Sequence, residues 1–150
     1  MRVVIQRVCE AQVTIDDKEK RGIPQGLVVL LGIEMADNKN DVEWLVNKIV
    51  NLRIFNDAEE VMNRSLLDVK GSLMVVSQFT LMAATKKGNR PSYIRAAKHE
   101  HAIPLYEYFV LNAKQLLEDQ VVTGTFAADM QVALVNDGPV TIIIDSKLKE

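Results

Sequence analysis

Short apolar runs, some alternating with polar residues and some uninterrupted, predict several β-strands. They cover residues 2–15, 26–33, 53–55, 73–76, 130–136 and 140–144. In the first run the two-residue period changes phase near Val8 and Cys9, which indicates a bulge or bend. The run 26–33 is almost wholly apolar, so we expect a central strand that is buried on both faces.

Two longer stretches repeat apolar residues every three or four positions, which is the pattern of an amphipathic helix. The first covers residues 38–52, and either Asn38 or Asn40 can cap its N-terminus. The second covers residues 103–117 and places Pro104 in its first turn, where proline is tolerated. A shorter helix, capped by Ser92, is expected just before the second one.

The order of these elements is strands, helix, strand, helices and a closing strand pair. The closing strands are expected to be joined by a turn at residues 137–139. This order predicts the α+β class: a mixed, mainly antiparallel and barrel-like sheet with two main helices packed against it. A length of 150 residues and the absence of a linker or repeat predict one domain, residues 1–150.

The composition excludes several classes of protein. Hydrophobic residues make up 48% and charged residues 25%, which argues against a disordered or fibrous chain. No apolar run approaches the roughly 20 residues that span a bilayer, and the first residues do not resemble a signal peptide, so no membrane partner is expected. The single cysteine, Cys9, allows no internal disulfide, and a cytoplasmic location is the default expectation. The net charge of −2 gives no overall sign of nucleic-acid binding.

Candidate chemistry begins where the run at residues 73–76 ends. The polar and aromatic residues that follow it are Ser77, Gln78, Phe79 and Thr80. A buried strand that ends in hydroxyl and amide groups presents them at the rim of a sheet, where sites are commonly built. The alternative is that these hydroxyls only begin an ordinary turn.

Other reactive residues give weaker signals. No G-x-S-x-G motif and no phosphate-binding loop is present. His99 and His101 are two positions apart, and we expect exposed residues near a helix end rather than catalytic bases. Cys9 is expected to be a small buried apolar residue. With one Cys and two His, a Cys-rich zinc site is excluded, and we expect no metal.

Two further features are candidates for binding. The first is a basic patch with no acidic residue between its members, which are Lys86, Lys87, Arg90, Arg95 and Lys98. Such a patch is suited to phosphate groups, although an ordinary solvated surface has the same composition. The second is Gly138-Pro139, because an X–Pro bond is the only common place for a cis peptide. An ordinary hairpin turn is the alternative there.

Several segments together resemble the D-aminoacyl-tRNA deacylase family, once called D-tyrosyl-tRNA deacylases. They are MRVVIQRV at the start, GIPQGLVVLLGI, SQFTL from Ser77, KGNRPS from Lys87 and NDGPVT from Asn136. The similarity extends over nearly the whole chain. One departure is FAADM from Phe126, where the family pattern is FGADM, so Ala127 restricts the backbone of that loop.

The resemblance implies a homodimer that hydrolyses the ester of D-aminoacyl-tRNA, or of glycyl-tRNA, and releases the free amino acid and tRNA without a cofactor. It implies that Gly138-Pro139 is cis and enters the pocket of the partner subunit, where it excludes L-aminoacyl groups. Arg7 matches a residue that orients this turn. Phe126 and Met130 match positions that line the pocket.

For the chemistry, the resemblance points to Ser77, Gln78, Phe79 and Thr80. Backbone N–H groups at this strand end are expected to stabilise the oxyanion. The sequence offers no base to activate Thr80, so we favour attack by water. The basic patch is expected to bind the tRNA acceptor stem, and no DNA partner is expected. Two other functions remain open: a non-catalytic tRNA-binding dimer, and a general Ser/Thr esterase.

Overall fold

The computed structural model describes residues 1–150. Its strands and helices, in chain order, are β1 (Arg2–Ile15), β2 (Glu19–Ile23), β3 (Gly26–Gly32), α1 (Lys39–Asn51), β4 (Phe55–Asn56), β5 (Met62–Arg64), β6 (Ser72–Ser77), the short 3-10 helix η1 (Phe79–Met82), α2 (His99–Leu117), the 3-10 helix η2 (Glu118–Gln120), β7 (Val121–Thr123) and β8 (Met130–Asp145). Neither of the two α-helices is long and apolar enough to cross a membrane.

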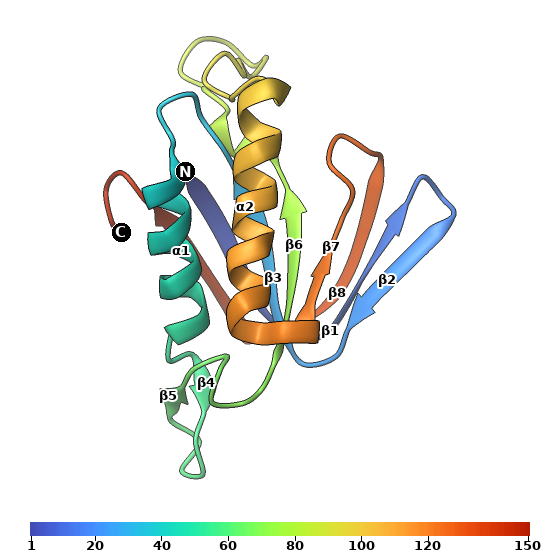
Figure 1. Ribbon diagram of the computed structural model, residues 1–150, viewed down its shortest axis with the longest axis vertical. Coiled ribbons are helices and arrows are strands. Elements are labelled where there is room, and N and C mark those ends of the chain that lie inside the picture. The colour runs from blue at the N-terminus through green and yellow to red at the C-terminus, as the bar shows by residue number, and fades with distance from the viewer.

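One mixed sheet organises the molecule. Its strands follow the order β2-β1-β3-β6-β7, and β8 pairs with the other edge of β1. β1 is antiparallel to β2, β3 and β8, whereas β3, β6 and β7 run parallel to one another. Both α-helices lie against one face of this curved sheet (Figure 1). The predicted α+β class, with two main helices on a mixed sheet, is therefore confirmed.

The core explains why these segments form these elements. The larger apolar cluster contains 25 buried residues between the sheet and the helices. In α1 the buried positions recur at helical spacing, with Val42, Leu45 and Ile49 all fully buried. A second cluster of 8 buried residues covers the opposite face of the sheet. β3 contributes to both clusters, so it is buried on both faces as predicted.

The closing strand pair was predicted wrongly, because residues 130–145 form one strand, β8. Both halves of β8 pair with β1: Gln131 lies opposite Thr14, and Thr141 lies opposite Gln6. Between them, residues 137–140 leave the ladder opposite the single residue Arg7. The phase change in β1 is thus a real irregularity, as expected, but Cys9 beside it is exposed rather than buried.

The second helix also differs from its prediction. α2 begins at His99, so Pro104 lies inside the helix and removes one backbone hydrogen bond there. Residues 92–98 form no helix, because Ser92 and Ala96 make isolated β-bridges with Ala84 and Glu34. The short strands β2, β5 and β7 were not predicted, since their stability comes from neighbours that are distant in sequence.

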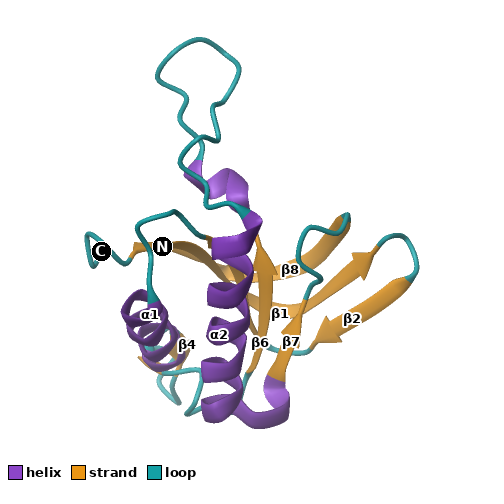
Figure 2. Ribbon diagram, turned by 45° about the horizontal axis from the view of Figure 1, so that its top comes forward, coloured by secondary structure: helices purple, strands orange, loops and turns teal.

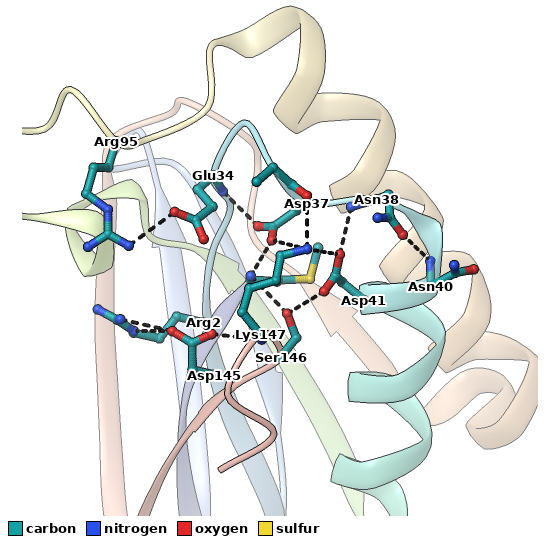
Figure 3. A network of polar contacts seen from close by, with 12 residues as sticks. Arg2, Glu34, Asp37, Asn38, Asn40, Asp41, Arg95, Asp145, Ser146 and Lys147 are labelled. Carbon is teal, nitrogen blue, oxygen red and sulfur yellow. Dashed lines mark hydrogen bonds and ion pairs between the residues drawn. The ribbon is translucent and has the colours of Figure 1, made fainter.

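A network of polar contacts fixes the start of α1 (Figure 3). Asn38 is the N-cap: its side chain accepts a hydrogen bond from the Asn40 N–H at 2.9 Å, and its own N–H donates to Asp41 Oδ2 at 2.9 Å. Asp41 also accepts from Ser146 Oγ and Lys147 Nζ, both at 2.7 Å. The network therefore ties the residues after β8 to the first turn of the helix.

This network predicts a dependence of stability on pH. Burial acts to raise the pKa of Asp41, but the hydrogen bonds from Lys147, Ser146 and Asn38 outweigh burial and lower it from 3.8. A carboxylate with a lowered pKa stabilises the fold above its unfolded pKa, and this stabilisation is lost as the pH falls through the folded value. Asp41→Asn should reduce the free energy of unfolding at pH 7 by about 2 kcal/mol.

The measurement is urea unfolding followed by circular dichroism at pH 7, 5 and 3. The difference in stability between the variant and the unmodified protein should narrow as the pH falls below 3.8, because the unfolded chain then binds a proton at Asp41 that the folded protein, with its lowered pKa, takes up only at lower pH. Glu59→Gln, at an exposed carboxylate in the loop before β5, is the matched control and should leave the curve unchanged. A constant difference between Asp41→Asn and the unmodified protein at all three pH values would contradict the assignment.

Candidate active site

The residues predicted at the rim of the sheet lie where β6 turns into η1. The Gln78 N–H donates to the Leu31 carbonyl at 2.8 Å, which extends the pairing of β6 with β3 by one residue. Inside η1 the N–H of Leu81 donates to the Gln78 carbonyl at 3.2 Å. The N–H groups of Phe79 and Thr80 have no hydrogen-bond acceptor in the protein. Two adjacent backbone donors are therefore free at this strand end.

The side chains of this turn contain no activated nucleophile. Gln78 Nε2 donates to Thr80 Oγ1, so an amide and not a base is the polar neighbour of the threonine hydroxyl. The Phe79 ring is 58% exposed and meets the ring of Tyr93 edge-on, with the ring centroids 5.2 Å apart. Ser77 is half-buried and makes no side-chain hydrogen bond that would activate it.

A cavity of about 900 Å³ opens beside the turn. Its larger lining side chains come from the end of β6, the start of α2 and the segment that leads into β8: Ser77, Gln78, Phe79, Lys98, His99, Glu100, Phe126, Asp129 and Met130. Its floor is apolar and includes Leu31, Ile33 and Val76. The structure thus brings together the predicted residues Ser77, Gln78, Phe79, Phe126 and Met130, and it adds Lys98 from the basic patch.

His99 is a lining residue that sequence reasoning missed. As expected, it is exposed at a helix end, but its ring also meets Phe126 edge-on with centroids 5.5 Å apart. On its other side Phe126 contacts Tyr106, at 5.7 Å between centroids. Tyr106 donates its hydroxyl to the Val75 carbonyl at 3.0 Å, and burial raises the pKa of Tyr106 to about 12. Of these three rings, His99 and Phe126 line the cavity, and the buried Tyr106 supports Phe126 without lining it. Phe126 is distant in sequence from the other two residues, so no local sequence pattern predicts the contact.

The backbone at Ala127, where the family pattern FGADM has glycine, shows why glycine suits this position. Its φ is +62°, in the left-handed region that glycine adopts without strain and alanine does not. We predict that Ala127→Gly raises the free energy of unfolding by about 0.5–1 kcal/mol, since the relief of strain exceeds the greater freedom that glycine gives the unfolded chain. The neighbouring Ala128 has no positive φ, so Ala128→Gly should instead lower stability. Urea unfolding measures both variants. A change of the same sign in their free energies of unfolding would show that the positive φ of Ala127 is not a source of strain.

The Gly138-Pro139 turn lies outside this cavity. Its peptide bond is cis, as the resemblance implies, and both residues are exposed. Neither of them is among the residues that line the cavity of their own chain. The turn projects from β8 at the point where residues 137–140 leave the ladder.

Arg7 holds this turn from below. Its side chain is 6% exposed, and its Nε lies 3.2 Å from the Asp137 carbonyl oxygen and 3.1 Å from Asp137 Oδ2. Its Nη1 donates to the carbonyl of Ile54, just before β4. A Cβ placed on Gly138 would lie 3.1 Å from Arg7 Nη2, so the guanidinium also fills the space beneath the glycine. The turn is exposed, but its base is fixed.

The basic patch is divided by the fold. Lys86, Lys87 and Arg90 lie in the long loop between η1 and α2, which extends away from the body of the molecule (Figure 2), and they pair with no carboxylate. Arg95 donates to Glu34 Oε2 at 3.2 Å and is partly neutralised. Lys98 lies at the cavity. No group of three His, Cys, Asp or Glu side chains could hold a metal ion.

Comparisons with known proteins identify the relatives of this chain. The family described as D-Tyr-tRNA(Tyr) deacylase matches residues 4–145. The D-aminoacyl-tRNA deacylase of Flavobacterium psychrophilum is 61% identical over 150 residues, and that of Bacteroides fragilis is 59% identical, with both chains covered completely in each case.

Two solved structures share the fold. The one titled c-Myc DNA Unwinding Element Binding Protein is 38% identical, with a TM-score of 0.91 over 97% of this chain and 98% of that one. A probable eukaryotic D-amino acid tRNA deacylase has a TM-score of 0.83 at 15% identity, over 95% and 97% of the two chains, and supports the fold alone. On the full-length match to its relatives, the chain belongs to the D-aminoacyl-tRNA deacylase family of hydrolases.

Proposed function

We propose that this deacylase works as a homodimer in which the Gly138-Pro139 turn of one protomer enters the cavity of the other. The turn admits D-aminoacyl and glycyl groups to the N–H groups of Phe79 and Thr80 and excludes L-aminoacyl groups. The observation that carries this proposal is a turn that is exposed and outside its own cavity, yet fixed at its base by Arg7. A free loop would not need a buried arginine beneath it.

Selection by such a turn follows from its chemistry. Main-chain carbonyls are suited to accept hydrogen bonds from the substrate's ammonium group, because charge-assisted hydrogen bonds are short and directional. With the ammonium and the ester carbonyl both fixed, the side chain of an L-amino acid points into the turn and that of a D-amino acid points away. Glycine has no side chain and is admitted. The turn therefore distinguishes D- from L-aminoacyl groups without recognising which side chain the amino acid carries.

The free N–H groups of Phe79 and Thr80, where β6 turns into η1, are suited to stabilise an oxyanion. Water attacks the ester carbon, and the carbonyl oxygen becomes an oxyanion that accepts hydrogen bonds from both N–H groups. The bond from the carbon to the ribose oxygen then breaks, and this oxygen takes a proton as tRNA leaves. A donor in such a position contributes roughly 3–4 kcal/mol of transition-state stabilisation. The terminal ribose hydroxyl of the tRNA is close enough in this scheme to help position the water.

Phe79→Pro tests the oxyanion role with little structural change. Phe79 is the first residue of η1, where proline fits, and the preceding Gln78, with φ −142° and ψ 81°, is outside the α region that a following proline disfavours. The variant removes one N–H donor and should lower kcat by about 100- to 1,000-fold. Phe79→Leu, which removes the ring but keeps the N–H, is the matched control and should retain most of kcat.

Attack by water, rather than by Thr80, is supported by the neighbours of the hydroxyl. With only the Gln78 amide beside it, Thr80 has no group that would take its proton. Thr80→Ala should therefore retain kcat within about tenfold, a smaller loss than a nucleophile shows. Complete loss of turnover, together with a trapped aminoacyl-enzyme on the unmodified protein, would show that Thr80 is the nucleophile.

The cavity is suited to the last nucleoside of the tRNA. Its volume of about 900 Å³ and its apolar floor accommodate a base and ribose, and Phe126 and His99 offer ring edges to the base. Lys98 at its edge is suited to the adjacent phosphate. The ester then lies at the mouth of the cavity, beside the end of β6.

One assay separates the proposal from its alternatives. The protein is incubated with D-tyrosyl-, L-tyrosyl- and glycyl-tRNA, and loss of each ester is followed. The proposal expects loss of the D-tyrosyl and glycyl esters only. A general esterase removes both enantiomers and small activated esters as well. A non-catalytic dimer binds tRNA and removes none.

A mixed dimer tests the cross-subunit arrangement. One protomer carries Gly138→Ala and the other carries Phe79→Pro, each inactive as a homodimer. If the turn serves the partner's cavity, the mixed dimer contains one intact site and recovers up to about half of the activity per dimer. If each turn serves its own chain, no intact site forms and no activity returns. Sedimentation of the unmodified protein checks that a dimer exists.

The basic patch should bind tRNA through phosphates. We predict that changing Lys86, Lys87 and Arg90 together to glutamine weakens tRNA binding at low salt and leaves kcat unchanged. The negative slope of log K, the logarithm of the association constant, against log salt should become less steep by about 2. Lys70→Gln with Lys114→Gln, at exposed sites elsewhere, is the control. Because one structural relative is titled as a DNA-binding protein, duplex DNA is a useful competitor, and we expect it to displace tRNA poorly. An unchanged slope would show that these three residues do not bind tRNA phosphates.

A further inference from the structure

An ion pair at the far end of η1 holds the turn that carries Phe79 and Thr80. Arg2 begins β1 and Asp145 ends β8, and the two are direct partners in the ladder. Arg2 Nε and Nη2 both donate to Asp145 Oδ2, at 3.2 Å and 2.9 Å (Figure 3). The remaining arm, Nη1, donates to the carbonyl oxygen of Leu81 at 3.1 Å. The guanidinium therefore joins the sheet to η1.

The hydrogen bond from Arg2 gives the Leu81 carbonyl oxygen a donor that η1 itself does not supply. No backbone N–H reaches the Leu81 carbonyl, as is usual at the end of a short helix. The orientation of the arginine is in turn fixed by Asp145, whose Oδ1 accepts from the Lys147 N–H at 3.0 Å. Burial acts to raise the pKa of Asp145, but the hydrogen bonds from Lys147 and Arg2 prevail and lower it, so the carboxylate is charged at neutral pH.

β3 holds η1 from another side. A Cβ placed on Gly32 would lie 2.9 Å from Leu81 Cβ and 3.1 Å from the Gln78 carbonyl oxygen, so η1 is in close contact with the sheet. Gln78 is also bound to β3 through its N–H. The start of η1 is thus fixed by β3 and its end by Arg2. Phe79 and Thr80, with their free N–H groups, lie between these two points.

We propose that Arg2, oriented by Asp145, is a positioning residue for deacylation. It fixes the Leu81 end of η1 and thereby the direction of the Phe79 and Thr80 N–H groups. The inference rests on the proposed oxyanion role of those groups. Hydrogen-bond donors act on a transition state only when they are held in place, and a displacement of about 1 Å can reduce the rate up to about 100-fold. Arg2 is not among the residues that line the cavity, so its effect on the reaction passes through η1.

The test measures kcat and KM separately on D-tyrosyl-tRNA. Arg2→Gln should lower kcat about 10-fold and leave KM within about twofold, because tRNA binding is untouched while the donors lose their position. Arg2→Lys keeps one cationic donor and should recover part of kcat. Asp145→Asn leaves the arginine in place but less firmly oriented and should lower kcat about 3-fold. Arg64→Gln is the matched control, because Arg64 is exposed and donates to the Asp68 carbonyl at 2.8 Å, far from η1 in the fold.

A second readout distinguishes positioning from general instability. The amide NMR signals of Phe79 and Thr80 should shift in Arg2→Gln, whereas those of α1 core residues should not. Unchanged kcat in Arg2→Gln would overturn the inference, as would equal losses in Arg2→Gln and Arg2→Lys with unmoved amide signals. The Phe79→Pro variant keeps the two proposals separate: if it retains full kcat, the oxyanion role fails, and if it is inactive while Arg2→Gln is fully active, only the inference fails.

Discussion

Replacing Gly138 with alanine should lower kcat/KM for D-tyrosyl-tRNA by about 100-fold or more, because the displaced turn no longer meets the substrate. Gly138 has a φ of +118°, which L residues rarely adopt. An added Cβ would also lie 3.1 Å from Arg7 Nη2 and 3.1 Å from Val140 Cγ2. The backbone must therefore move, and the turn moves with it.

The ratio of D to L hydrolysis is the more specific readout for Gly138→Ala. A turn that acts as the filter should lose selectivity when displaced, so this ratio should fall together with the rate. Gly22→Ala is the control, since a Cβ there meets only the Ala11 carbonyl oxygen at 3.3 Å and its φ is not in the left-handed region. A Gly138→Ala protein with unaltered rate and unaltered selectivity would show that the turn plays no part in the reaction.

Arg7→Met should lower the free energy of unfolding by about 2 kcal/mol, because it leaves the buried Ile54 carbonyl without a donor and removes the cation beside the partly exposed Asp137 carboxylate. Methionine fills similar space but donates no hydrogen bond. The carbonyls of Asp137 and Ile54 and the carboxylate of Asp137 all lose their contact. Activity on D-tyrosyl-tRNA should fall as in Gly138→Ala, since the base of the turn is no longer fixed.

Urea unfolding measures the change, and a double-mutant cycle assigns it. Arg7→Met and Asp137→Asn are made singly and together, and a coupling energy above about 1 kcal/mol is expected for groups in direct contact. Arg53→Met is the matched control: Arg53 is exposed and donates to the Asn63 carbonyl at 2.9 Å, so its loss should change stability by less than about 0.5 kcal/mol. No coupling, with wild-type stability of Arg7→Met, would show that water replaces the arginine contacts.

Of the residues in these two predictions, Arg7 was singled out only through a resemblance, because nothing in the pattern of MRVVIQRV marks it as functional. Gly138 was also marked by the X–Pro bond that follows it, but an ordinary hairpin turn was the alternative there. The structure adds the physical content: four residues of β8 stand opposite Arg7 alone, and the guanidinium binds the segment that leaves the ladder. Neither the residue patterns nor the resemblance marked His99 and Arg2 as functional. Their roles depend on contacts with Phe126 and Leu81, which are distant from them in sequence.

Local patterns determined the elements whose stability is local. The apolar stripe of α1 and the uniformly apolar runs of β3 and β6 were predicted, because the spacing of apolar residues indicates whether one face or both faces of an element are buried. The cap of α1 was narrowed to Asn38 or Asn40, and the structure shows that it is Asn38. The rest was decided by pairing across the fold. β8 is one strand only because β1 offers it a partner along both halves, and Cys9 is exposed only because β1 is irregular there. Contacts between distant segments leave no pattern in the local sequence. The polar end of β6 was therefore predicted, but the cavity that it shares with the start of α2 and the loop before β8 required the tertiary structure.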